Sequence, residues 1–149
     1  MKIVVDTNIV FSAILNSSGR IGKILIHSKG HFQFYTCHFL KTELLKHRRK
    51  LQKITGLEIT AIEELESLII KNITFINESL IPEKIMTSTE KMLTGIDIND
   101  TPFVALTRHL KAKLWTGDKQ LANGLITKKF KSVINTAALS KLLDKLESK

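Results

Sequence analysis

The chain of 149 residues has little cysteine, proline or aromatic side chain. A single cysteine, Cys37, cannot form an internal disulfide, and with no export signal we expect the protein to reside in the cytoplasm. Long uncharged stretches are also missing, because Asp6 and Asn8 interrupt the one apolar N-terminal run, Ile3 to Leu15. We therefore expect neither a signal peptide nor a membrane span, and no membrane partner.

Acidic residues are scarce relative to basic ones, with 14 Asp and Glu against 23 Lys and Arg and a net charge of +9. A surface of this sign attracts polyanions, and we expect nucleic acid to be the partner. Hydrophobic residues make up 43% of the chain, which is enough for one buried core. Two domains would be cramped at this length, so residues 1–149 are expected to form a single domain.

Apolar periodicity alternates between strand-like and helix-like segments along the whole chain. The strand-like segments are Lys2–Val5, Phe32–Thr36, Ile73–Ile76, Lys113–Thr116 and Ser132–Ile134. The helix-like segments are Asn8–Asn16, Gly19–Lys29, His38–Lys53, Leu57–Lys71, Pro82–Leu93, Thr101–Leu110, Lys119–Leu125 and Thr136–Leu146. Strands separated by helices predict a three-layer α/β/α sandwich around a central parallel sheet of four to five strands.

Asp6 and Asp118 each follow a predicted strand and precede a predicted helix. Ligands of parallel sheets gather at this end of the strands, where the loops converge. Taken singly, each residue is explained as a helix N-cap that accepts hydrogen bonds from free backbone amides. Together they also fit one cation, because two carboxylates on neighbouring strands repel each other without it. Both interpretations stay open at this point.

A third acidic stretch runs from Asp97 to Pro102 and begins another predicted helix. Asp100 or Thr101 can cap this helix, whose first turn holds Pro102, while Asp97 and Asn99 make an Asx turn. Capping and metal binding are compatible, because a capping carboxylate has further lone pairs that can face an ion. The stretch therefore adds candidate ligands without excluding a purely structural role.

Three stretches resemble the motifs of the PIN-domain ribonucleases, which include the VapC-like toxins of bacterial toxin–antitoxin pairs. The stretches are Ile3-Val4-Val5-Asp6-Thr7-Asn8, Asp97-Ile98-Asn99-Asp100-Thr101-Pro102-Phe103-Val104-Ala105-Leu106 and Leu114-Trp115-Thr116-Gly117-Asp118-Lys119-Gln120-Leu121. The first resembles an apolar strand ending in Asp-Thr-Asn, the second an Asp before a helix carrying Ala-Leu, and the third a strand ending in Thr-Gly-Asp. The resemblance covers nearly the whole chain in order and implies a PIN-like fold.

By this resemblance four acids carry over as the catalytic, metal-binding carboxylates: Asp6, Glu43, Asp100 and Asp118. Glu43 is the acid in the expected stretch between the first and third motifs, although by itself it reads as a solvated helix residue. Thr7, Asn8 and Thr116 carry over as supporting residues. Of the two acids in the second motif, Asp100 is the preferred metal ligand because it lies closer in sequence to the helical residues Phe103–Leu106. Asp97 is assigned as a supporting residue at the rim of the site.

Mg²⁺ or Mn²⁺ is the cofactor that such a site implies. Mg²⁺ keeps several waters and is held by a few carboxylates and by substrate phosphate oxygens, so four acids suit it. The ion would lower the pKa of a bound water and polarise the scissile phosphate. The sequence is compatible with one bound ion or with two. The Thr7 and Thr116 hydroxyls and the Asn8 amide are suited to orienting the carboxylates. For the threonines, β-propensity at strand ends is an equally good explanation.

Basic residues follow Glu43 and recur in the last third of the chain. The predicted RNA contacts are Lys46, Arg48, Arg49 and Lys119, and the later group contains Lys111, Lys113, Lys119, Lys128, Lys129 and Lys131. Such residues either form a phosphate track leading to the acidic pocket or simply a solvated face. Aromatic residues make up only 6% of the chain, so we expect RNA recognition to depend on shape more than on base stacking.

The resemblance implies a metal-dependent endoribonuclease that hydrolyses RNA phosphodiester bonds as the toxin of a toxin–antitoxin pair. Its expected partners are RNA, an antitoxin protein and a second copy in a homodimer. The antitoxin could dock on the apolar stretches Leu40–Leu51 and Ile62–Ile70, which core burial explains equally well.

Two alternative functions remain. One is a haloacid-dehalogenase-like phosphohydrolase with Asp6 as nucleophile, although that family's second Asp, two positions later, is Asn8 here. The other is a catalytically degraded PIN-like module that binds RNA or a partner without cutting.

Overall fold

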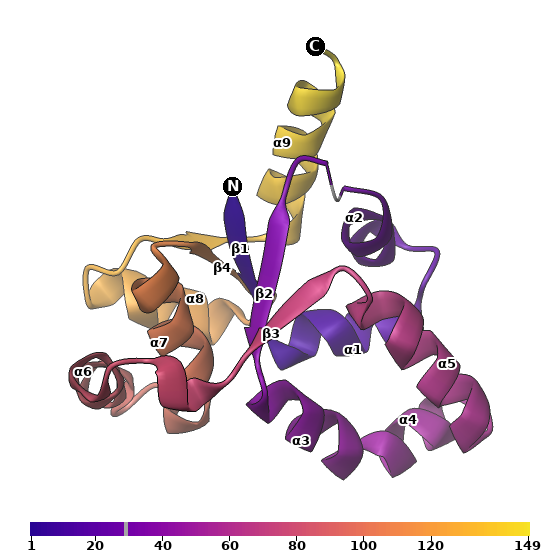
Figure 1. The fold of residues 1–149 in the computed structure, drawn as a ribbon, viewed down its shortest axis with the longest axis horizontal. Coiled ribbons are helices and arrows are strands. Elements are labelled where there is room, and N and C mark those ends of the chain that lie inside the picture. Colours follow the sequence, from indigo (N-terminus) through magenta and orange to yellow (C-terminus); the bar gives the residue numbers. More distant parts are fainter. Residues whose placement is uncertain (29) are drawn as a thin grey trace.

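A computed structural model describes residues 1–28 and 30–149 of the chain. The part that it describes is centred on a five-stranded parallel sheet with the strand order β3-β2-β1-β4-β5 (Figure 1). The strands are β1 Lys2–Val5, β2 Gln33–Cys37, β3 Ile73–Ile76, β4 Lys113–Trp115 and β5 Val133–Ile134. The predicted parallel sheet is therefore confirmed, with β1 in its middle.

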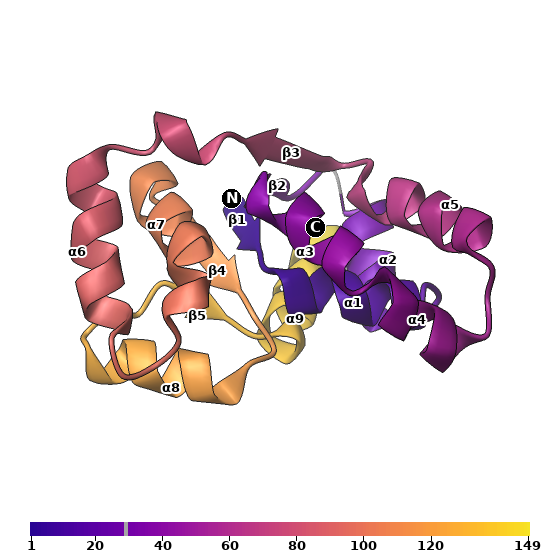
Figure 2. The ribbon, with the colours of Figure 1, turned by 90° about the horizontal axis from the view of Figure 1, so that it is seen from below.

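Helices cover both faces of this sheet (Figure 2). They are α1 Thr7–Leu15, α2 Arg20–His27, α3 Phe39–Lys46, α4 Arg48–Thr55, α5 Ile59–Ile70, α6 Glu83–Leu93, α7 Thr101–Leu110, α8 Lys119–Thr127 and α9 Thr136–Glu147, with 3₁₀ turns η1 Glu78–Leu80 and η2 Ile98–Asp100. On one side α7 packs across β1, β2 and β4 with α6 outside it, and on the other side α1 packs with α2 and α5. The three-layer α/β/α class is confirmed.

The strand β1 is apolar on both faces because helices cover it from both sides. Its residues Ile3, Val4 and Val5 have no solvent exposure. In the neighbouring β4, Trp115 is fully buried, and its indole Nε1 donates a hydrogen bond to the Thr136 hydroxyl at 3.0 Å. The sheet is thereby tied to α9, and the chain segments that leave β1 and β4 start from fixed positions.

The predicted single helix His38–Lys53 was wrong in one respect, because the chain bends at His47. The segment forms α3 and α4, with His47 between them at φ −102° and ψ 10°. The bend turns α4 toward α5, where the Arg48 guanidinium donates to the Glu66 carboxylate at 2.8 Å. Gly56, at φ 71°, then ends α4 in the left-handed conformation that glycine adopts without strain.

Two further differences concern element ends. The predicted helix Gly19–Lys29 corresponds to α2, and its predicted end at Lys29 lies outside the described residues. The turns η1 and η2 were not predicted; they are capped by Asn77 and Asp97, whose side chains accept hydrogen bonds from the backbone amides two residues later.

Across residues 1–28 and 30–149 no single helix is long and apolar enough to cross a membrane. Among the same described residues, α1 and α2 taken together pass this test by length and composition, but a bend of 107° separates them.

Candidate functional site

The first two acids lie at the carboxyl ends of adjacent strands. In the parallel pair of β1 and β4, Val5 lies opposite Trp115. Asp6 follows Val5 directly, and Asp118 comes three residues after Trp115. The expectation that both carboxylates leave the same edge of the sheet is thereby met.

Asp6 and Asp118 are both helix caps. The carboxylate Oδ1 of Asp6 accepts a hydrogen bond from the Ile9 amide at 3.1 Å, and Oδ1 of Asp118 accepts one from the Leu121 amide at 3.1 Å. The cap interpretation is therefore confirmed for both residues. Each cap hydrogen bond orients the carboxyl group through Oδ1, and Oδ2 remains available to bind a cation.

Asp100 behaves differently, because its side chain makes no cap hydrogen bond to α7. The neighbouring Thr101 hydroxyl donates backward to the Ile98 carbonyl at 2.6 Å. Asp97 accepts from the Asn99 amide at 3.0 Å, which is the predicted Asx turn. Helix capping therefore does not explain the Asp100 carboxylate.

Glu43 is held in place by a residue far away in sequence. The Thr7 hydroxyl, at the start of α1, donates to Glu43 Oε1 in α3 at 2.8 Å. Glu43 is half-buried, so it is not the solvated surface acid that its basic sequence neighbours suggested. This contact brings α3 to the segment that follows β1.

One cavity of about 180 Å³ brings the predicted acids together. It is lined by Asp6, Thr7, Asn8, Phe11, Glu43, His47, Asp97, Asn99, Asp100 and Asp118. The acids come from the end of β1, from α3, from the η2–α7 junction and from the segment after β4. Four separate parts of the chain thus contribute carboxylates to a single hollow.

Burial and neighbouring carboxylates raise the pKa of two acids in this cavity, Asp100 and Asp6. Burial, and then the negative charges of Asp97, Asp6, Asp118 and Glu43, raise the pKa of Asp100 from 3.8 to about 7. Burial raises the pKa of Asp6 to about 6, with a smaller contribution from Asp118. Hydrogen bonds from the Thr116 hydroxyl and the Ile9 amide work in the opposite direction on Asp6. A cation bound in the cavity would be attracted by these carboxylates and would offset the repulsion between them.

The predicted supporting residues have specific contacts. Thr116 is buried, and its hydroxyl accepts a hydrogen bond from the Asp118 amide at 3.1 Å while it also contacts Asp6. Thr7 holds Glu43. Asn8 is exposed and lines the cavity. Both threonines thus touch a carboxylate or the segment that carries one, in addition to any preference for their backbone conformation.

Three lining residues were not among the predicted site residues: Phe11, His47 and Asn99. Phe11 and His47 pack edge to face, with ring centroids 5.5 Å apart. Phe11 lies four residues after Thr7, and His47 four residues after Glu43, so helical spacing from two predicted residues was the signal that could have found them. Asn99 lies within the acidic stretch itself.

A divalent cation fits the donor set of this cavity. Carboxylate oxygens are the ligands that Mg²⁺ and Mn²⁺ prefer, and mutual repulsion among the acids is what such an ion relieves. Within the described ranges, however, no three His, Cys, Asp or Glu side chains are close enough to hold one ion directly. The arrangement suits a hydrated ion that touches few carboxylates, which is the usual state of protein-bound Mg²⁺.

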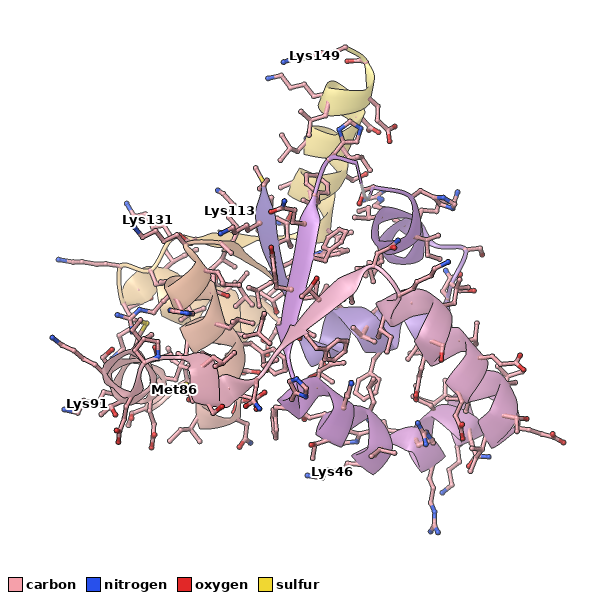
Figure 3. The ribbon with its side chains drawn as sticks, in the orientation of Figure 1. Lys46, Met86, Lys91, Lys113, Lys131 and Lys149 are labelled. Carbon is pink, nitrogen blue, oxygen red and sulfur yellow. The ribbon has the colours of Figure 1, made fainter. Side chains whose placement is uncertain are left out.

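The predicted RNA contacts divide into two kinds. Lys46, Arg49 and Lys119 are exposed; Lys46 projects from α3 (Figure 3), and Lys119 is the residue after Asp118. Arg48 is committed elsewhere, because its guanidinium lies 2.8 Å from Glu66 and 3.9 Å from Glu63. Its role is to hold α4 against α5, and we do not carry it forward as an RNA contact.

An apolar cavity of about 310 Å³ adjoins the acidic one. It is lined by Asn8, Phe11, Leu15, His47, Lys50, Leu51 and Ile54, so three residues border both cavities. Leu15 and Ile54 are exposed, although both are large and apolar. The acidic cavity therefore opens beside a hydrophobic groove between α1 and α4.

Comparison with known proteins gives one family match and similar folds. A family model described as the PIN domain matches residues 4–140. No curated protein sequence matches the chain. The chain is similar in structure to VapBC2 from Rickettsia felis bound to a DNA fragment from their promoter, with a TM-score of 0.66 and 16% identity over 91% of this chain and 97% of that one.

A second similar structure is PAE2754 from Pyrobaculum aerophilum. Its TM-score is 0.69 and its identity 12%, over 97% of this chain and 90% of that one. At such identities the two likenesses establish the fold.

Proposed function

The chain belongs to the PIN-domain family, whose members are generally nucleases, and on that premise we propose that it is a Mg²⁺- or Mn²⁺-dependent endoribonuclease. The observation that carries the proposal is the convergence of Asp6, Glu43, Asp100 and Asp118 on one cavity. We do not retain the dehalogenase-like alternative, because residues 4–140 match the PIN-domain family, which is a different family.

The acidic residues of the cavity would act by holding a divalent ion in a fixed position next to the phosphate of the substrate. The divalent ion supplies Lewis acidity, which polarises a phosphate oxygen and acidifies a water. Asp6, Asp100 and Asp118 would hold it partly through its bound waters, and Glu43 would complete the acidic wall of the cavity. The caps on Asp6 and Asp118 and the Thr7 hydroxyl on Glu43 keep these carboxylates oriented before substrate binds.

RNA is the proposed substrate because family resemblance and charge agree. The net charge of +9 attracts a polyphosphate chain, while the cavity itself is acidic. Exposed Lys46, Arg49 and Lys119 are available to bind phosphates on either side of the bond that is cut. Without a cation the acidic cavity would repel that phosphate, so charge complementarity itself favours a metal-dependent reaction.

We further propose that the chain is the toxin of a toxin–antitoxin pair. The similarity to VapBC2 supports this assignment, and the apolar groove beside the acids offers a docking place for an antitoxin segment. An apolar helix lying on Phe11, Leu15 and Ile54 would cover the mouth of the acidic cavity and exclude RNA. For a homodimer, a second copy of the chain would dock on a different apolar surface, the exposed side chains Ile59 and Leu68 of α5.

Incubation of the purified protein with RNA tests the proposal. We expect cleavage with Mg²⁺ or Mn²⁺, loss of cleavage with EDTA, and loss in Asp6→Asn and Asp118→Asn. Asparagine caps helices as well as aspartate does, so neither variant should melt below the wild-type temperature. Cleavage that survives EDTA or both substitutions would overturn the mechanism, and salt-sensitive RNA binding without any cleavage would favour the catalytically degraded alternative.

A further inference from the structure

Four lysines that flank the starts of β4 and β5, Lys111, Lys113, Lys129 and Lys131, lie at the end of the sheet opposite the acids. Lys113 begins β4, and Lys131 lies two residues before β5, whereas Asp118 follows the carboxyl end of β4. The Leu114 amide donates to the Ser132 carbonyl at 2.8 Å, so the two loops are neighbours. In Figure 3 the labelled Lys113 and Lys131 both lie on the side of the sheet where the chain begins. These lysines therefore do not form the predicted track around the acidic pocket.

The two loops share one sequence pattern, a lysine, an apolar residue and a second lysine. The loop before β4 is Lys111-Ala112-Lys113, and the loop before β5 is Lys129-Phe130-Lys131. Ala112 is buried and Phe130 packs against the core, so the middle residue anchors each loop. All four lysines are exposed. The pattern presents two parallel pairs of positive charges at one edge.

The two loops also share one backbone conformation. The Ala112 amide donates to the Thr107 carbonyl at 3.0 Å, and the Phe130 amide donates to the Leu125 carbonyl at 2.9 Å. Each bond spans the end of the preceding helix in the way that defines a Schellman motif. The equivalent geometry means that the two lysine pairs are presented in the same way on adjacent strands.

Lysine takes the place of glycine in both motifs. Lys111 has φ 54° and Lys129 has φ 67°, and within the described residues they are the non-glycine positions with positive φ. The left-handed conformation costs an ordinary residue about 1 kcal/mol, which is why glycine usually occupies this position. The chain does use glycine at the end of α4, at Gly56. At the other two positions lysine places a positive charge where glycine would place none.

Acidic residues do not offset this charge locally. From Thr101 to Leu143 the chain has one acid, Asp118, and it lies at the opposite end of β4. Lys and Arg in the same interval are Arg108, Lys111, Lys113, Lys119, Lys128, Lys129, Lys131 and Lys141. With eight basic residues and one acid, this interval carries a net charge of +7.

We propose that Lys111, Lys113, Lys129 and Lys131, which we call the lysine edge, bind the phosphate backbone of a folded RNA substrate. This inference rests on the ribonuclease proposed above and specifies which RNA it takes. Adjacent strands lie about 4.8 Å apart, so the two lysine pairs are close enough to contact neighbouring phosphates of one RNA backbone. A membrane surface would require apolar anchors, and neither middle residue of the loops is exposed.

The separation of the two sites determines the kind of RNA. Four residues of β1 extend about 13 Å from the amino edge of the sheet to the edge that carries the acids. Phosphates bound at the lysine edge therefore lie at least about 13 Å from the bond that is cut, farther along the same strand or on another strand of the same molecule. A short single-stranded oligonucleotide can occupy the acidic cavity without reaching the lysine edge, whereas a folded RNA reaches both.

Charge reversal separates these contacts. All proteins carry Asp118→Asn, so that RNA is bound without being cut, and RNA affinity is measured by fluorescence anisotropy over a range of salt. The test variant is Lys113→Glu with Lys131→Glu, and the control is Lys84→Glu with Lys91→Glu on α6, which changes net charge equally. Thermal melting checks that both are folded. The probes are a folded hairpin RNA and a short unstructured oligonucleotide.

We expect the test variant to bind the hairpin RNA about tenfold more weakly at about 50 mM salt, with the salt slope reduced by about 1.4–1.8 for two lost phosphate contacts. Its affinity for the oligonucleotide should fall no more than that of the control. Equal losses in both variants, an unchanged hairpin affinity, or tighter binding to anionic vesicles or an acidic protein than to RNA would overturn the assignment.

Wild-type protein assayed for cleavage of the same RNAs distinguishes the two proposals. Failure to cut either RNA would refute the ribonuclease, whereas cutting with hairpin affinity unaffected by the lysine substitutions would refute the lysine edge alone.

Discussion

The acid cluster should destabilise the metal-free protein, and Asp100→Asn should relieve that effect. Burial and neighbouring carboxylates raise the pKa of Asp100 from 3.8 to about 7. Three pKa units correspond to about 4 kcal/mol at most, and because Asp100 is only half-buried, solvent screening reduces the figure to about 1–2 kcal/mol. No cap hydrogen bond is lost with the substitution, because the Asp100 side chain makes none.

The pH dependence gives this effect a definite sign. The native carboxyl group binds its proton more tightly than the unfolded chain does, so its contribution to stability is complete below a pH of about 4. That contribution is lost as the pH rises through about 7. Asparagine cannot ionise and escapes the loss. The advantage of the variant over wild type should therefore grow between these two pH values.

Thermal unfolding in EDTA measures the difference. At a pH of about 8 we expect Asp100→Asn to melt about 3–6 °C above wild type, and at a pH of about 4 the two should coincide. Asp144→Asn removes the same charge from an exposed position of α9 and should bring no gain. Excess Mg²⁺ should shrink the advantage, because the ion stabilises wild type more. A variant less stable than wild type at the higher pH, or a gain independent of pH, would refute the reasoning.

Two other contacts yield predictions of their own. Thr7→Val removes the hydroxyl that donates to Glu43 and should lower cleavage activity about ten- to a hundredfold without lowering the melting temperature, while Thr7→Ser should retain activity. Arg48→Met leaves the Glu66 carboxylate buried without its partner and should lower the free energy of unfolding by about 3 kcal/mol in a urea titration. Adding Glu66→Leu should recover most of that loss, and a double variant no more stable than the single one would contradict this account.

Much of the fold followed from local sequence patterns. The strands Lys2–Val5 and Ile73–Ile76 and the helix Thr101–Leu110 have the predicted bounds, because continuous apolar runs and a proline in the first helical turn are local signals. The bend at His47 was missed for the opposite reason. Helical periodicity continues across it, and the ion pair between Arg48 and Glu66 that accompanies the bend joins residues 18 positions apart.

The candidate site shows the same division. Asp6 and Asp118 could be placed because the end of a parallel strand is recognisable and strands of one sheet end together. The position of Glu43 depends on the Thr7 hydroxyl, 36 residues away, and no local pattern records that contact. Phe11 and His47 reach the cavity through helix packing, which is likewise a tertiary property.

Anomalous scattering from crystals soaked in Mn²⁺ shows whether the acidic cavity binds a divalent ion, because it locates the ion without reference to activity. We expect a manganese peak in the cavity lined by Asp6, Asp100 and Asp118, and loss of that peak in Asp118→Asn crystals. A cavity without a peak at saturating Mn²⁺, or a peak bound elsewhere while RNA is still cleaved, would contradict this prediction.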